Sequence, residues 1–192
     1  MTTTTGTPTP LPSATAFRAV ARCVVTTVGL LARHRIRCPS RNVGTWLSFG
    51  DGTSAYVYRE TVIDRIPSPE PCVLLVRFEL WGVRGRGHAW FRRESILNTV
   101  LFAGFPGLIT KLWLAHDQRG VYRGLYEWDG AASADAYARA LWRVLALVSV
   151  PGSIDYRVLP GLRRRDLPVT AARHGAGGTE WWRVTEFHSS AA

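Results

Sequence analysis

The segment formed by residues 71–165 constrains the fold most, because strand-like and helix-like patterns alternate in it over short loops. Periodicity predicts strands at 72–81, 108–115, 121–128 and 153–159, and helices at 88–103 and 133–148. Turn sequences such as Gly104-Phe105-Pro106-Gly107 separate these elements. The order predicts an α+β protein built on a ferredoxin-like βαββαβ unit.

The flanking segments divide the rest of the chain. Residues 1–13 are rich in Thr and Pro and are predicted to be disordered. Residues 14–70 predict an N-terminal helix and a β-hairpin extension, since an Asp-Gly turn lies between two strand-like runs. The polar tail, residues 166–192, contains Trp181 and Trp182 and predicts an extra strand or a lid.

The formal net charge of +10 raises the question of an anionic partner. Lys111 is the one lysine in the chain, and the remaining basic residues are arginines. Proteins that bind nucleic acid tend to cluster basic residues. Here the arginines are scattered, apart from the run 163–165, so no nucleic-acid partner is expected.

Cysteine use and the N-terminal apolar stretch predict a cytoplasmic protein. The three cysteines form no C-x-x-C pair, which argues against a disulfide framework or a zinc site. The stretch 14–31 contains Arg18 and Arg22, so no membrane span is expected. A helix packed on the body of the protein or on a dimer partner is preferred to an amphipathic helix on a membrane surface.

Side-chain alternation predicts which residues occupy the sheet face that the two helices of the unit leave uncovered. That face is expected to collect mixed charges and tryptophans: Arg77, Glu79, Trp81, Lys111, Trp113, Asp155 and Arg157. For the third strand, two sets stay open, either Tyr122, Tyr126 and Trp128 or Arg123, Leu125 and Glu127. Such a face is either a ligand pocket or a surface covered by solvent or a dimer partner.

Motifs for chemistry are sparse. His88 precedes a predicted helix and is a candidate general base, with a surface or capping role as the alternative. The element Gly85-x-Gly87 lacks the full spacing of a dinucleotide-binding or P-loop motif. The sequence predicts no metal site.

Three sequence stretches resemble the YdhR-type monooxygenases of the dimeric α+β-barrel group, which includes the antibiotic-biosynthesis monooxygenases. They are Gly104-Phe105-Pro106-Gly107 with Lys111 and Trp113, Gly120-x-Tyr122-x-Gly124-x-Tyr126-x-Trp128, and Ala134-x-Ala136-Tyr137-Ala138. The resemblance implies a homodimer and cofactor-independent chemistry, often oxygenation of polyketide-like aromatics, with cyclases and isomerases among the relatives. The helix-hairpin extension and the Trp-rich tail depart from the family pattern.

The resulting hypothesis is a small-molecule enzyme of specialised metabolism, either a cofactor-independent oxygenase or a cyclase/isomerase. In it, Arg77 and Lys111 stabilise an enolate or phenolate, and His88 or Glu79 moves the proton. The substrate-binding residues would be Trp81, Trp113, Lys111, Tyr126, Trp128 and Arg157. The alternative is a non-catalytic ligand-binding or dimeric scaffold protein.

Overall fold

The computed structural model describes residues 10–66, 69–82, 99, 101–168 and 180–188. Two α-helices lie in these residues, α1 (Ser13–Ala32) and α3 (Ala131–Leu145), together with the short 3-10 helix η2 (Arg164–Asp166). The strands are β1 (Ile36–Arg37), β2 (Trp46–Phe49), β3 (Ser54–Ile63), β4 (Pro71–Glu79), β5 (Leu108–Leu114), β6 (Val121–Asp129), β7 (Asp155–Pro160) and β8 (Val184–His188).

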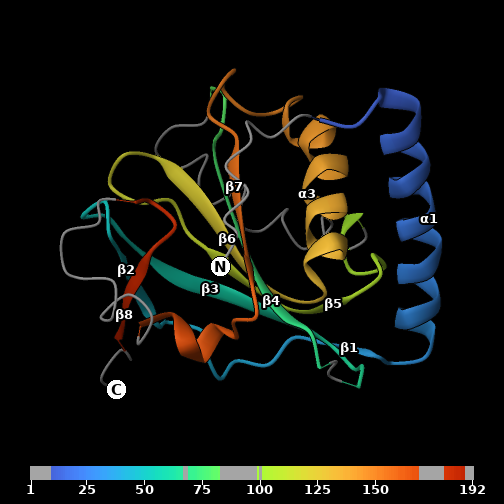
Figure 1. Ribbon diagram of the computed structural model, residues 1–192, viewed down its shortest axis with the longest axis horizontal. Coiled ribbons are helices and arrows are strands. Elements are labelled where there is room, and N and C mark those ends of the chain that lie inside the picture. Colours follow the sequence, from blue (N-terminus) through green and yellow to red (C-terminus); the bar gives the residue numbers. More distant parts are fainter. Residues whose placement is uncertain (1–9, 67–68, 83–98, 100, 169–179, 189–192) are drawn as a thin grey trace.

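The strands form one eight-stranded sheet in which the order is β7-β4-β6-β5-β3-β2-β8, with β1 paired to β3. Every pairing is antiparallel. The sheet curls strongly, and α3 lies between it and α1 (Figure 1).

The predicted α+β class is confirmed, but the predicted ferredoxin-like βαββαβ unit is wrong. The four strands of that unit, β4 to β7, are part of a larger sheet, because β3 pairs along the edge of β5 and the sheet continues into β2 and β8. The backbone groups at the β5 edge are thereby satisfied within the chain. The N-terminal hairpin is thus part of the central sheet, and the expected helix at 88–103 lies mostly outside the described residues.

Both faces of the curled sheet are buried. The face toward α3 carries a cluster of apolar side chains that includes Leu74, Val76, Trp113, Tyr126, Trp128 and Tyr137. The opposite face carries a second cluster that includes Leu47, Phe49, Val57, Val73, Leu75, Leu112, Leu114, Leu125 and Leu167. Trp181 and Trp182, next to β8, pack against this second cluster. A sheet that is buried on both sides leaves no face for a solvated polar surface.

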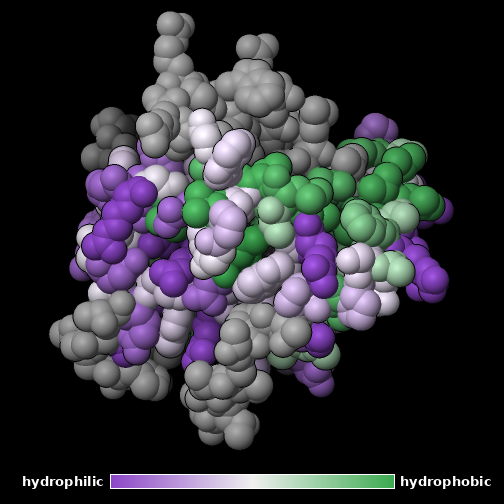
Figure 2. All heavy atoms as spheres, turned by 90° about the horizontal axis from the view of Figure 1, so that it is seen from above, coloured by the Kyte–Doolittle hydropathy of each residue, from purple (hydrophilic) through white to green (hydrophobic). Residues whose placement is uncertain are grey.

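The helix α1 contacts the rest of the protein through a narrow stripe of small residues. Ala16, Cys23 and Thr27 are its buried positions, and they repeat at intervals of seven and four residues. The opposite side of α1 exposes apolar side chains, among them Phe17, Val25, Val28 and Leu31. Figure 2 shows apolar residues gathered at the end of the molecule that α1 forms.

By length and composition alone, α1 is also long and apolar enough to cross a membrane. Within the described residues it is the one helix of which this is true. A helix near the N-terminus that packs on a soluble protein passes the same test, so the cytoplasmic location stays a prediction.

Helix α1 packs closely against the backbone at Gly104. A Cβ atom at this position would overlap the Cys23 carbonyl oxygen and lie 2.8 Å from both Thr27 N and Thr27 Oγ1. We expect Gly104→Ala to lower the free energy of unfolding by about 1–3 kcal/mol, because the helix must move to admit a methyl group. Chemical denaturation measures this change. The matched control is Gly29→Ala on α1, where a Cβ meets nothing within 4 Å. This control is expected to be neutral, or stabilising by about 1 kcal/mol at most; equal losses in the two variants would contradict this account of the α1 contact.

Candidate functional site

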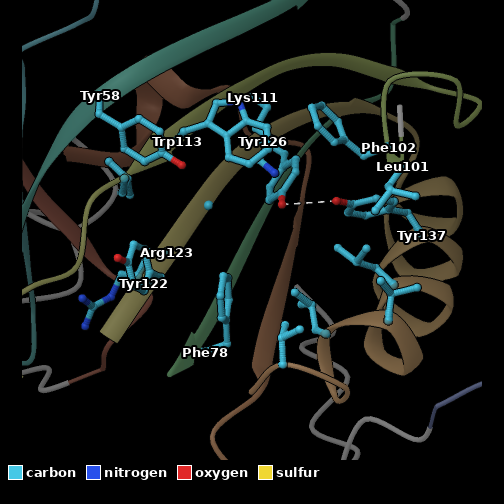
Figure 3. Close-up of a pocket in the computed structure, with 16 residues that line it drawn as sticks. Tyr58, Phe78, Leu101, Phe102, Lys111, Trp113, Tyr122, Arg123, Tyr126 and Tyr137 are labelled. Carbon is cyan, nitrogen blue, oxygen red and sulfur yellow. Dashed lines mark hydrogen bonds between the residues drawn. The ribbon is translucent and has the colours of Figure 1, made fainter. Parts of the chain in front are cut away.

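A cavity of about 180 Å³ lies between α3 and the sheet (Figure 3). Strands β3 to β6 and helix α3 contribute most of its lining, which is largely aromatic and aliphatic. The lining residues are Tyr58, Phe78, Leu101, Phe102, Lys111, Trp113, Leu114, Tyr122, Arg123, Gly124, Tyr126, Tyr137, Leu141, Val144, Leu145 and Val148. Among the described residues, no carboxylate or histidine lines the cavity, so Lys111 is the main candidate for proton chemistry.

An irregularity in β5 accompanies the orientation of Lys111 toward the cavity. The pairing of β5 with β6 shifts register between Leu108 and Thr110, as at a β-bulge. In a regular strand, two side chains lie on the same face only when their positions differ by an even number. Leu108 and Trp113 differ by five positions, yet both belong to the cluster on the α3 face, because the bulge shifts the alternation by one residue. Leu112 belongs to the cluster on the opposite face.

This arrangement corrects the predicted faces. Lys111 and Trp113 were expected on the side that the helices leave bare, but they face α3. The third strand of the predicted unit, β6, also places Tyr122, Tyr126 and Trp128 toward α3. The physical reason is that both faces are apolar, so the preference of leucine for a dry environment does not distinguish one face from the other.

The Lys111 ammonium position is enclosed by three aromatic rings, which we call the aromatic cage: Phe102, Trp113 and Tyr126. Lys111 Nζ lies 3.2 Å from the ring centroid of Trp113, 4.2 Å from that of Phe102 and 4.8 Å from that of Tyr126 (Figure 3). The whole residue is only 6% exposed. Among the described residues, no carboxylate forms an ion pair with it.

The surroundings of Lys111 favour its neutral amine. Burial, followed by the positive charge of Arg59, lowers the pKa of Lys111 well below the ordinary lysine value of 10.5. The Arg59 guanidinium lies 4.0 Å from the Trp113 ring centroid, so two basic groups share one indole. Burial also lowers the pKa of Arg59. The indole is held in place by Trp113 Nε1, which donates a 3.1 Å hydrogen bond to Thr61 Oγ1 on β3.

Two tyrosines of the cavity lining are hydrogen-bonded to each other. The Tyr137 hydroxyl, on α3, donates to the Tyr126 hydroxyl over 3.2 Å. Burial raises the pKa of Tyr126 and of Tyr137, so both phenols stay protonated at neutral pH. Because Tyr126 accepts from Tyr137, its own proton is left for another acceptor.

Two further residues of the predicted site lie on the face opposite to the cavity. Arg77 forms a 3.3 Å ion pair with Asp155 and stacks over Trp181, at 4.7 Å from the ring centroid. Arg157 stacks over Trp182, at 5.1 Å. The structure therefore does not bring these two arginines together with Lys111, and it uses them to hold the tryptophans of the tail.

Three more of the predicted residues, Glu79, Trp81 and Trp128, also lie away from the cavity lining. Glu79 is exposed at the end of β4, and Trp81 is 75% exposed. Trp128 is fully buried and packs on Tyr137, with ring centroids 4.8 Å apart. His88 lies outside the described residues. Of the nine predicted site residues, the cavity lining contains Lys111, Trp113 and Tyr126.

Sequence reasoning missed Tyr58, Arg59, Phe102 and Tyr137. Tyr58 and Arg59 belong to β3, which was assigned to an extension, so no pattern pointed to them. Tyr137 was recognised as one of the inward-facing residues of its helix, and only the three-dimensional pairing with Tyr126 gives it a polar role. In the part of the chain that the structure describes, no group of three or more His, Cys, Asp or Glu residues is placed to hold a metal ion.

No protein family, curated protein or solved structure matches this chain in the comparisons. The geometry therefore has to define the site: an apolar, aromatic pocket with a buried amine and a phenol donor. A pocket of this kind can bind a small hydrophobic molecule, accept a proton from it and donate a hydrogen bond to the resulting oxyanion.

We expect that Lys111 lowers the free energy of unfolding at neutral pH. Its pKa is lower in the folded chain than in the unfolded chain, so the free energy of unfolding rises with pH between the lowered pKa and 10.5. At pH 7 we expect Lys111→Met to stabilise the protein by about 1–3 kcal/mol, because a buried polar group is replaced by an apolar one. The gain should shrink as the pH rises toward 10.5.

Denaturation of both proteins across this pH range measures the difference. Leu112→Met on the opposite face of β5 is the control, and its effect is expected to be independent of pH. A methionine variant that is less stable than the parent at every pH would show that the ammonium in its aromatic cage supports the fold.

Proposed function

We propose that this chain is a cofactor-independent enzyme that removes a proton from a small hydrophobic molecule bound between α3 and the sheet. The observation that carries the proposal is the buried Lys111 amine, which faces an aromatic cavity without a carboxylate partner in the described residues. The product of this step is an enolate or a phenolate. An isomerase or cyclase rearranges such an anion, and an oxygenase lets it react with molecular oxygen.

The cavity limits the size of the substrate. An apolar cavity of about 150 Å³ is large enough to hold benzene. The cavity of about 180 Å³ therefore suits a molecule with one aromatic ring and a short polar substituent. The polyketide-like substrate implied by the family resemblance would have to be a small member of that class.

The described groups can support both halves of the proton transfer. Lys111, when neutral, accepts the proton, and the resulting ammonium is stabilised by the rings of Phe102, Trp113 and Tyr126. The Tyr126 phenol can donate a hydrogen bond to the oxyanion that develops on the substrate. The ammonium, Arg59 and this phenol together form a positive environment for an anion, and the dry surroundings strengthen it.

The resemblance to the YdhR-type monooxygenases agrees with this proposal, since it also implies chemistry on an aromatic substrate without a cofactor. The homodimer that it implies remains a prediction. A non-catalytic ligand-binding protein is the alternative, and it shares the pocket but not the proton transfer.

Proton removal can be measured without knowledge of the natural substrate. In D₂O the methyl protons of acetophenone exchange slowly for deuterium, and NMR follows the loss of their signal. We expect the protein to accelerate this exchange, with a rate that increases with pH through the lowered pKa of Lys111 because the neutral amine is the base.

Three variants test the assignment of roles. Lys111→Met should abolish the acceleration, and Tyr126→Phe should reduce it by about 10²-fold while binding of acetophenone persists. Tyr56→Phe is the matched control, because Tyr56 lies on β3 outside the cavity lining and contacts Trp46. Binding without any acceleration would favour the ligand-binding protein, and exchange that survives Lys111→Met would remove the amine from the mechanism.

A further inference from the structure

We infer that the Lys111 amine forms a covalent imine with a small aldehyde or ketone bound in the cavity. This inference rests on the proposed function and narrows it, because it names carbonyl compounds as the substrate class. It starts from the placement of the amine: Lys111 Nζ is 3.2 Å from the Trp113 centroid, its residue is buried, and its side chain lines a cavity wide enough for one ring.

Structural lysines usually keep the ammonium in water or pair it with a carboxylate. The chain follows that rule for another buried cation near the cavity. Arg123 is paired with Asp117 at 2.6 Å and with Asp51 at 2.9 Å. Lys111 has no such partner among the described residues, and Arg59, the charge that lowers its pKa after burial, is also a cation. An amine whose pKa is lowered by an apolar pocket and a second cation is the arrangement that activates lysine as a nucleophile.

The chemical step balances without a co-reactant. The nitrogen lone pair of the neutral amine adds to the carbonyl carbon, the carbonyl π bond breaks, and one amine proton moves to the oxygen to give a carbinolamine. The Tyr126 phenol then protonates the departing hydroxyl group, which leaves as water. The second nitrogen proton returns to the Tyr126 oxygen, so the net result is a neutral imine plus one water molecule.

The geometry favours this product over the ammonium form. An imine at Lys111 carries no charge when it is unprotonated, so the dry pocket no longer has to hold an ammonium ion beside Arg59. Tyr126 lines the same cavity, with its ring centroid 4.8 Å from Lys111 Nζ, and its hydroxyl proton is not used by Tyr137. Before the second nitrogen proton returns, the nitrogen is part of a protonated iminium, which makes the adjacent C–H of a ketone more acidic. On this route the Tyr126 oxygen, in place of Lys111, accepts the C–H proton, and an enamine forms.

The chain offers a clean test, because Lys111 is its one lysine. The full chain is incubated at pH 7 with benzaldehyde and sodium cyanoborohydride, which reduces an imine to a stable benzylamine. A protease that cleaves only after lysine cuts the untreated chain once and fails to cut the labelled chain. A second digestion, with a protease that cleaves after glutamate, releases residue 111 on a peptide that lacks the N-terminus, and mass spectrometry then places one benzyl group on that peptide and separates it from any label on the α-amine.

We expect labelling of the folded chain to be at least about tenfold faster than labelling of the guanidinium-unfolded chain, in which the lysine regains its ordinary pKa. Lys111→Met should lose the internal label, and Tyr126→Phe should react about tenfold or more slowly, while Tyr56→Phe, which lies outside the cavity lining, reacts as the parent does. Pyrene-1-carboxaldehyde, which is too large for the cavity, should label only the unfolded chain. Equal rates in the folded and unfolded chains, or labelling of the folded chain by the pyrene aldehyde, would overturn the inference.

Binding of benzyl alcohol, measured by ligand-observed NMR, separates failure of the imine from failure of the proposed function. If benzyl alcohol binds and acetophenone exchanges its protons, but no benzyl group is trapped at Lys111, the imine is overturned and the proposed function stands. If benzyl alcohol does not bind and no exchange is accelerated, both are overturned.

Discussion

The burial of both faces of one curled sheet is the constraint on which the rest of this structure depends. Helix α3 covers one face, and the inward curl of the strands, with the segment after β7, covers the other. Any side chain on the central strand β5 must therefore enter one of two dry layers. The register shift after Leu108 accompanies the entry of Lys111 into the layer beneath α3, so the composition of the cavity is tied to a backbone irregularity.

The buried charged groups of this chain have two different kinds of partner. Glu60 is fully buried. It accepts a 2.7 Å hydrogen bond from Asn42 and forms a 3.2 Å ion pair with Arg164. Arg123 has its two aspartates. Such paired charges tie distant strands and turns together, and breaking one of these pairs would leave an uncompensated charge in the core. Lys111 contacts aromatic ring faces in place of a carboxylate. Aromatic rings stabilise an ammonium ion less than a carboxylate does, so the neutral amine is favoured.

The sequence revealed the parts of the fold that depend on local pattern. The four strands β4 to β7 and helix α3 were predicted near their observed positions, because alternation, helical spacing and turn residues are short-range signals. The faces of β4 and β7 were also predictable, since Leu74 and Tyr156 pack toward α3 while Leu75 and Arg157 point away. The face of β5 was not, because Leu112 is as well buried on the far side as Trp113 is on the near side. Long-range pairing, such as that of β3 with β5, has no signal in the local pattern.

That pairing shows why the site is a property of the whole sheet. Thr61 on β3 accepts the hydrogen bond that holds the Trp113 indole, and Arg59 on the same strand places its charge over that ring. Both residues come from the hairpin that the sequence pattern assigns to an extension. Without β3, residues 71–165 would keep Lys111 but lose the indole anchor and the second cation that depresses the pKa of Lys111. An exposed edge of β5 would also let water reach the amine, which would then be protonated like any surface lysine. The aromatic pocket and the lowered pKa of Lys111 therefore depend on the same strand pairing that extends the sheet beyond β5.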